Sequence, residues 1–157
     1  MSLVSNLLPH TLIMQNTAST SISPSIADHQ LPRRSLAFVL TVLLAVFMLV
    51  LAARAAFDPI GAAHGYGIDL ASPLDVSYLY VKAGRDLAIA AVLTALLVYG
   101  RTVPLLLTVG ALCIAPIVDG ILVTAHGKPG YALGVHGSAV AFGFVLVALL
   151  VRALRKR

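Results

Sequence analysis

Residues 81–99 read VKAGRDLAIAAVLTALLVY, and this stretch places three charges at the head of a long apolar run. The charges are Lys82, Arg85 and Asp86, and the next charged residue is Arg101. A charge inside a membrane span costs about 2.5–3.5 kcal/mol at the helix centre on insertion scales. Such residues need partners or a function, so the stretch predicts a membrane helix with a polar cluster near one end.

Composition places the rest of the chain in the same class. Of its 157 residues, 59% are hydrophobic and only 11% are charged, whereas soluble domains carry about 25% charged residues. The net charge is +5, but most of the basic residues flank apolar runs, which is typical of membrane topology and not of a nucleic-acid groove. Cys113 is the only cysteine, so an intramolecular disulfide is excluded.

Four apolar runs are each long enough to cross the roughly 30 Å hydrocarbon layer of a bilayer. We expect an all-α fold, a four-helix transmembrane bundle with spans at about 35–56, 78–99, 103–125 and 131–151. Residues 1–32 are polar and rich in Ser and Thr, which predicts a disordered tail ahead of a membrane domain at 33–157. Translation could start at Met1 or at Met14.

The expected helix ends follow from the turn residues. Pro59 should end the first span, and residues 62–77 should form a loop, with Asp75 or Ser77 capping the second span. Pro116 lies inside the third span and should kink it.

Basic residues flank both ends of the membrane domain and the second turn, at Arg33, Arg34, Arg101 and 152–157. Basic residues of short loops stay on the cytoplasmic side. We therefore expect both termini in the cytoplasm, with the first and third loops on the other side.

Most of the ionisable residues in or near the spans fall at one level, displaced toward the non-cytoplasmic side, and the cytoplasmic halves of the spans are apolar. This set comprises Arg54, Asp58, Lys82, Arg85, Asp86, Asp119, His126 and His136. We predict that these side chains converge in the bundle interior.

One interpretation of this convergence is ion pairing that fixes the helices in register. Charges in a low-dielectric interior need such partners. Arg85 could pair with Asp119, or Arg54 with Asp58 and Asp86. Small residues would permit close helix contacts, at Gly84 in the second span and at Gly130, Gly134 and Ser138 in the fourth.

A second interpretation is a pocket for a small lipophilic molecule with a polar head, or for a membrane partner, because such pockets form between bundle helices. A third is a membrane-embedded acid/base enzyme of the isomerase or cyclase type, with Asp86 or Asp119 as the carboxyl group. Its proton partner would be His64, His126 or His136. The sequence leaves open whether the protein is an enzyme.

The same histidines and Asp119 are possible metal ligands, but their spacing matches no metal signature, so we expect no metal and no cofactor. The expected partners are the lipid membrane, a lipophilic small molecule and a second copy of the chain.

Five short motifs carry a resemblance to a known family. They are Phe57-Asp58-Pro59, Gly65-Tyr66-Gly67-Ile68, residues 80–87 (YVKAGRDL), residues 116–119 (PIVD) and His136-Gly137. Over about 37–150 the chain resembles a family of small four-span membrane proteins known as a domain of unknown function, near the DoxX-like group. The resemblance implies a four-helix membrane fold and supplies no reaction.

Overall fold

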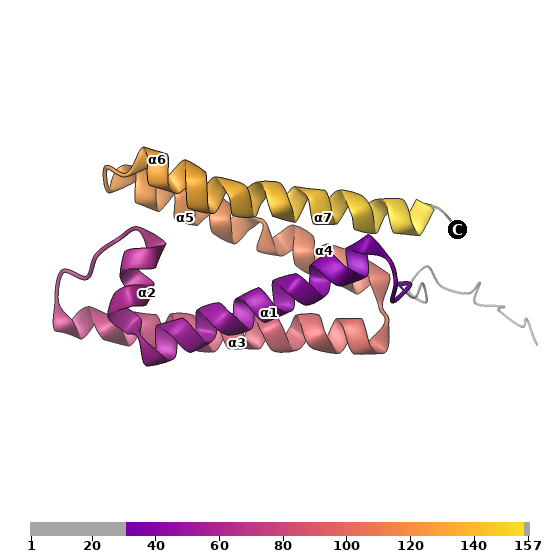
Figure 1. Ribbon diagram of the computed structural model, residues 1–157, viewed down its shortest axis with the longest axis horizontal. Helices are drawn as coiled ribbons and strands as arrows, with labels where there is room; N and C mark the ends of the chain where they lie inside the picture. Colours follow the sequence, from indigo (N-terminus) through magenta and orange to yellow (C-terminus); the bar gives the residue numbers. More distant parts are fainter. Residues whose placement is uncertain (1–30, 156–157) are drawn as a thin grey trace, which may run out of the picture.

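The computed structural model describes residues 31–155, which are almost entirely helical (Figure 1). The elements are α1 (Leu36–Phe57), α2 (Pro59–Tyr66), η2 (Pro73–Asp75), α3 (Val76–Tyr99), α4 (Thr102–Leu112), α5 (Ile114–Ala125), α6 (Pro129–Tyr131), η3 (Ala132–Gly137) and α7 (Ser138–Arg155). No strand occurs in this range, which confirms the all-α class.

Two antiparallel pairs of long rods make up the molecule (Figure 1). One pair is α1 with α3, and the other is the α4–α5 rod with α7. The start of α1, the turn between α3 and α4 and the end of α7 lie together at what we call the basic end. At the opposite, far end, α2 rises from the first pair toward α5 and α6.

Three helical segments are long and apolar enough to cross a membrane, namely Leu36–Phe57, Thr102–Ala125 and Pro129–Arg155. These segments support an integral membrane protein, and their bounds lie close to the predicted spans. The helix α3 has 24 residues, or about 36 Å, but it carries the charges of Lys82, Arg85 and Asp86. Length and composition therefore identify three spans and leave the fourth to be argued from packing.

The junction between α1 and α2 depends on Asp58. Its backbone N–H donates to the Arg54 carbonyl at 2.8 Å, and its side chain accepts from the Gly61 N–H at 3.0 Å. Because Pro59 follows at the first helical position, Asp58 ends one helix and caps the next. The loop predicted over 62–77 is wrong at its start, since α2 continues to Tyr66.

The chain between α2 and α3 also differs from the prediction at the cap. Asp75 precedes α3, but its carboxylate accepts from the N–H groups of Ala71 and Ser72, at 3.0 and 2.8 Å. Ser77 donates instead to the Leu74 carbonyl at 2.9 Å. Neither predicted side chain caps α3, because both stabilise the turn that leads into it.

The third rod is interrupted at Cys113, one turn before Pro116. Proline has no N–H to donate to the carbonyl four residues earlier, so the interruption lies where the sequence predicted a kink. At this level α7 comes very close: a Cβ added to Gly143 would lie 2.6 Å from the Cys113 sulfur. Gly143 is therefore the residue that lets α7 pack against the bend.

The apolar core occupies the half of the bundle nearest the basic end. Its fully buried leucines, Leu93, Leu105, Leu146 and Leu150, come from α3, α4 and α7. The polar side chains described next therefore lie on one side of this core, toward the far end.

Candidate functional site

The charges of α3 neutralise one another within their own helix. Lys82 donates to Asp86, one turn away, and the Arg85 guanidinium donates to the same carboxylate at 3.2 Å. The side chain of Asp86 is 3% exposed and that of Lys82 12%, whereas Arg85 is 51% exposed. We call these three residues the α3 charge cluster. A buried carboxylate needs such donors, because an unpaired charge is costly to bury.

The predicted ion pairs between helices are wrong. In residues 31–155, Asp119 accepts from the hydroxyl of Tyr66 at 2.8 Å and not from Arg85. Arg54 donates to the Gly61 carbonyl at 3.0 Å, and no ion pair within the described residues joins it to Asp58 or Asp86. The partners that the structure supplies are nearer along the chain, or are neutral hydroxyl and carbonyl groups.

Tyr66, the last residue of α2, makes two cross-chain hydrogen bonds. Its hydroxyl bonds Asp119 on α5, and its carbonyl lies 3.0 Å from Nε2 of His136 in η3. Since a carbonyl only accepts, Nε2 of His136 must carry the hydrogen. The two rings also meet edge to face, with centroids 5.2 Å apart. We call Tyr66, Asp119 and His136 the Tyr66 cluster.

The electrostatics of this cluster favour a protonated tyrosine. Burial and the hydrogen bond to Asp119 raise the pKa of Tyr66, with burial the larger cause. The nearby positive charge of Arg85 opposes them by lowering the pKa. Tyr66 is therefore a stable hydrogen-bond donor to Asp119, which is itself part-buried.

The backbone around His136 is adapted to close packing. Residues 132–137 form a π-helical segment, and such segments often occur at functional sites. A Cβ on Gly120 would lie 3.4 Å from the Cβ of His136, so glycine there lets α5 approach η3. Gly67 has φ of 99° and lies buried against Tyr131, where no other residue would fit without strain.

A third set of contacts at the far end joins the chain around α2 to the chain around α6. Lys128 and His64 both donate to Asp69, at 3.0 and 3.1 Å, and Tyr131 donates to the Gly65 carbonyl at 2.7 Å. The bonds from Lys128 and then His64 lower the pKa of Asp69. Because the folded-state pKa is depressed, these contacts persist at neutral pH and weaken only as pH falls below the usual carboxyl range.

A cavity of about 410 Å³ opens between the 67–75 loop, α3 and α5. Its apolar wall includes Ile68, Leu70, Leu79 and Leu122. Its polar groups include Tyr66, Lys82 and His126 together with the carboxylates of Asp69 and Asp75. Lys82, a member of the predicted polar layer, and Tyr66, which was not predicted, thus both line this cavity.

Other predicted residues do not join this site. His126 lines the cavity, but it is exposed and its Nδ1–H donates to the Leu122 carbonyl at 2.8 Å. Gly84 is exposed and a Cβ there would meet nothing within 4 Å, so it admits no helix of this chain. Gly130 and Gly134 are likewise open.

The possible metal ligands are held apart. His64 is exposed and bonded to Asp69, whereas His136 is buried against Tyr66. Within residues 31–155, no three His, Cys, Asp or Glu side chains are grouped so that they could hold a metal ion.

Sequence reasoning missed the central role of Tyr66 and the contact of Tyr131. The signal that could have found Tyr66 is its position between Gly65 and Gly67, where an aromatic ring is flanked by residues that permit close packing. Its partners lie 53 and 70 residues away, so the spacing could not name them.

The family described as Domain of unknown function (DUF4267) matches residues 45–151. The matched range contains the α3 charge cluster, the Tyr66 cluster and the far-end cavity. No curated protein and no solved structure matches the chain. Because the match covers more than half of the 157 residues, the protein belongs to this uncharacterised family, DUF4267.

Proposed function

We propose that the protein is a four-span integral membrane protein with α3 as its additional span. The helix packs along α1, and its exposed tyrosines favour this placement. Tyr78 and Tyr80 lie at one end and Tyr99 at the other, roughly 30 Å apart at 1.5 Å per residue. Tyrosines concentrate at the two membrane interfaces, and this separation matches the hydrocarbon thickness.

The α3 charge cluster is compatible with that depth. Asp86 would lie about 9 Å inside the level of Tyr80, with both of its oxygens bonded to cationic side chains. Pairing reduces the cost of inserting these charges.

We further propose that the basic end is cytoplasmic. We also propose that residues 33–157 together form the membrane domain. Five arginines and no acidic residue of the described chain lie at the basic end, namely Arg33, Arg34, Arg101, Arg152 and Arg155. All five aspartates of that range lie in the far half. This asymmetry supports the orientation because basic residues are retained on the cytoplasmic side.

The activity that we propose is binding of a small lipophilic molecule with a polar head in the far-end cavity. The observation that carries it is the apolar wall, with Lys82 and Tyr66 among its polar groups, of one cavity of about 410 Å³. Ligand sites are mostly apolar with a few placed polar groups, in the range of about 300–1,000 Å³. The ammonium of Lys82 donates to Asp86 but carries further N–H groups, which favour a head group that accepts hydrogen bonds. Asp69 and Asp75 on the same wall favour a head group that also donates.

Mass spectrometry of small molecules that co-purify with the protein in detergent tests this proposal. Ala71 is exposed on the loop and lines the cavity, so Ala71→Trp should fill the cavity and remove the bound molecule. Leu74 is 83% exposed and does not line the cavity, so Leu74→Trp is the matched control. A wild-type preparation without any such molecule, or equal retention in both variants, would refute it.

The second candidate is a membrane-embedded acid/base enzyme that uses Asp86 and Asp119. One observation favours it: Tyr66 lines the cavity and bonds Asp119, so a proton could pass between that carboxylate and a bound molecule. In this case Asp119→Asn should abolish a product and preserve binding. If the protein only binds the molecule, the wild type and Asp119→Asn should both leave it chemically unchanged.

A relationship to the DoxX-like group and a homo-oligomer both stay predictions from the sequence.

A further inference from the structure

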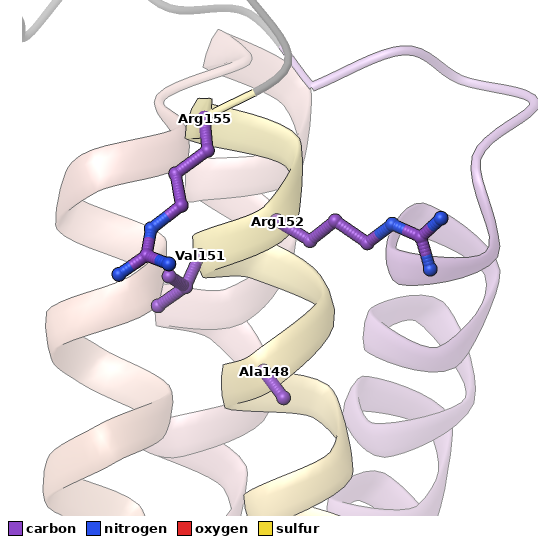
Figure 2. A pocket seen from close by; sticks show the side chains of 4 residues that line it. All are labelled: Ala148, Val151, Arg152 and Arg155. Atoms are coloured by element: carbon purple, nitrogen blue, oxygen red, sulfur yellow. The ribbon is translucent and has the colours of Figure 1, made fainter.

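The basic end holds a second cavity, separate from the far-end site. It has a volume of about 470 Å³ and lies over the last turns of α7. Figure 2 shows its four lining residues, Ala148, Val151, Arg152 and Arg155. The two arginine side chains extend to different sides of α7, and Ala148 lies one turn deeper along the helix.

Neither guanidinium has an acidic partner in the part of the chain that the structure describes. No salt bridge joins Arg152 or Arg155 to an aspartate of residues 31–155, and the helix α7 contains no acidic residue. Both arginines are exposed. Each guanidinium is therefore free of carboxylates of the described chain and able to bind a phosphate through two parallel hydrogen bonds, and rotation about the flexible arginine side chain can bring it to a headgroup in the cavity.

An apolar track leads from these arginines toward the bilayer interior. Phe144, Ala148 and Arg152 recur every four residues, so they share one face of α7. Phe144 is 58% exposed and Ala148 is also exposed, so this face is open along the track. A ligand that follows it needs an anionic head at the arginines and a hydrocarbon chain below them.

We propose that this cavity binds the headgroup of an anionic phospholipid from the leaflet at the basic end. Basic pockets beside membrane helices bind such headgroups, and each arginine near the surface adds to the attraction. The apolar track favours a lipid over a soluble anion, because only a lipid would cover it. The proposal is independent of whatever occupies the far-end cavity.

The test is native mass spectrometry of the full chain in a neutral detergent, with phosphatidylglycerol or phosphatidylcholine of the same acyl chains added. Neutral detergent removes the charged lipid surface, so only a lipid held by the protein is counted. We expect one phosphatidylglycerol to bind more tightly than phosphatidylcholine. Inorganic phosphate should not displace it; displacement would assign a soluble-anion site and overturn the proposal.

Two double variants separate this cavity from the general charge of the basic end. Arg152→Gln with Arg155→Gln should weaken phosphatidylglycerol binding by about 30-fold. Arg33→Gln with Arg34→Gln removes the same charge from the same end and should change binding by less than about threefold. Equal losses in both, or equal binding of the two lipids by the wild type, would overturn the proposal.

A third variant keeps the test valid if the arginine variant does not fold. Ala148→Phe retains both guanidinium groups and fills the exposed track, so it should also reduce binding. Helical circular dichroism checks each variant for folding. A folded Ala148→Phe protein that binds phosphatidylglycerol as the wild type does would refute the lipid-chain assignment.

Discussion

The hydrogen bond from Tyr66 to Asp119 should contribute more to stability than the other tyrosine hydrogen bond at the far end, that of Tyr131 to the Gly65 carbonyl. Tyr66→Phe removes only the hydroxyl and keeps the ring against His136. The part-buried carboxylate of Asp119 then loses its donor. A hydrogen bond to a charged group contributes about 1.5–3 kcal/mol, so we expect the free energy of unfolding to fall by that amount.

Tyr131→Phe is the matched control. Tyr131 also donates from its hydroxyl, to the Gly65 carbonyl in α2 at 2.7 Å, but the acceptor is neutral and Tyr131 is 39% exposed. Its loss should cost about 0.5 kcal/mol or less, because water can replace the partner. Both variants lack one tyrosine hydroxyl, so the comparison isolates the charged, part-buried acceptor.

The assay is reversible unfolding in mixed micelles, followed by helical circular dichroism. A double-mutant cycle of Tyr66→Phe with Asp119→Leu completes it, because removal of both polar partners should be less costly than the sum of the single changes. We expect a coupling of about 1.5 kcal/mol or more. Equal effects of Tyr66→Phe and Tyr131→Phe, with no coupling to Asp119, would refute the reasoning.

Three further predictions concern packing and charge, each checked by the same unfolding assay. Gly143→Ala should lower the free energy of unfolding by about 1–3 kcal/mol, since the added Cβ would lie 2.6 Å from the Cys113 sulfur. Adding Cys113→Ala should restore most of that loss, because the next nearest atom, the Cys113 Cβ, lies 3.9 Å away. Thr102→Val should stabilise the protein by about 1 kcal/mol, because the buried Thr102 hydroxyl has no partner in residues 31–155; unchanged or lower stability would contradict this. Lys82→Met should lower the free energy of unfolding by about 2–3 kcal/mol, because Asp86 loses its buried donor. Lys82→Met with Asp86→Leu should lower it by less, and a larger loss in the double variant would refute that pairing.

The helix bounds were predictable because they follow from run length and from residues with fixed backbone effects. The first span was expected at 35–56 and lies at Leu36–Phe57, and Pro116 marked the interruption of the third rod. The short helix α2 was not predicted. Gly61 and Gly65 gave its sequence a loop-like composition, although Asp58 followed by a proline is also a helix start signal.

The position of the polar groups along the helices was also predictable, but their partners were not. That position depends only on place within an apolar run, whereas partner choice depends on rotation and on the fold of the intervening chain. Lys82 and Asp86 are one turn apart, so their local bond was available to sequence reasoning. Tyr66 reaches Asp119 only because α2 folds back across the far end, which no periodicity encodes.

The two polar clusters of the far half are complementary in charge, and this complementarity explains why tyrosine lies between them. The α3 charge cluster carries two cations and one carboxylate, a formal charge of +1. The Tyr66 cluster carries the single carboxylate of Asp119, with His136 counted as neutral, a formal charge of −1. The positive charge of Arg85 opposes, without outweighing, the burial and the Asp119 hydrogen bond that raise the pKa of Tyr66, while Tyr66 donates to Asp119. A neutral donor between opposite charges satisfies the carboxylate without a direct ion pair, and it leaves Lys82 and Tyr66 at the cavity wall.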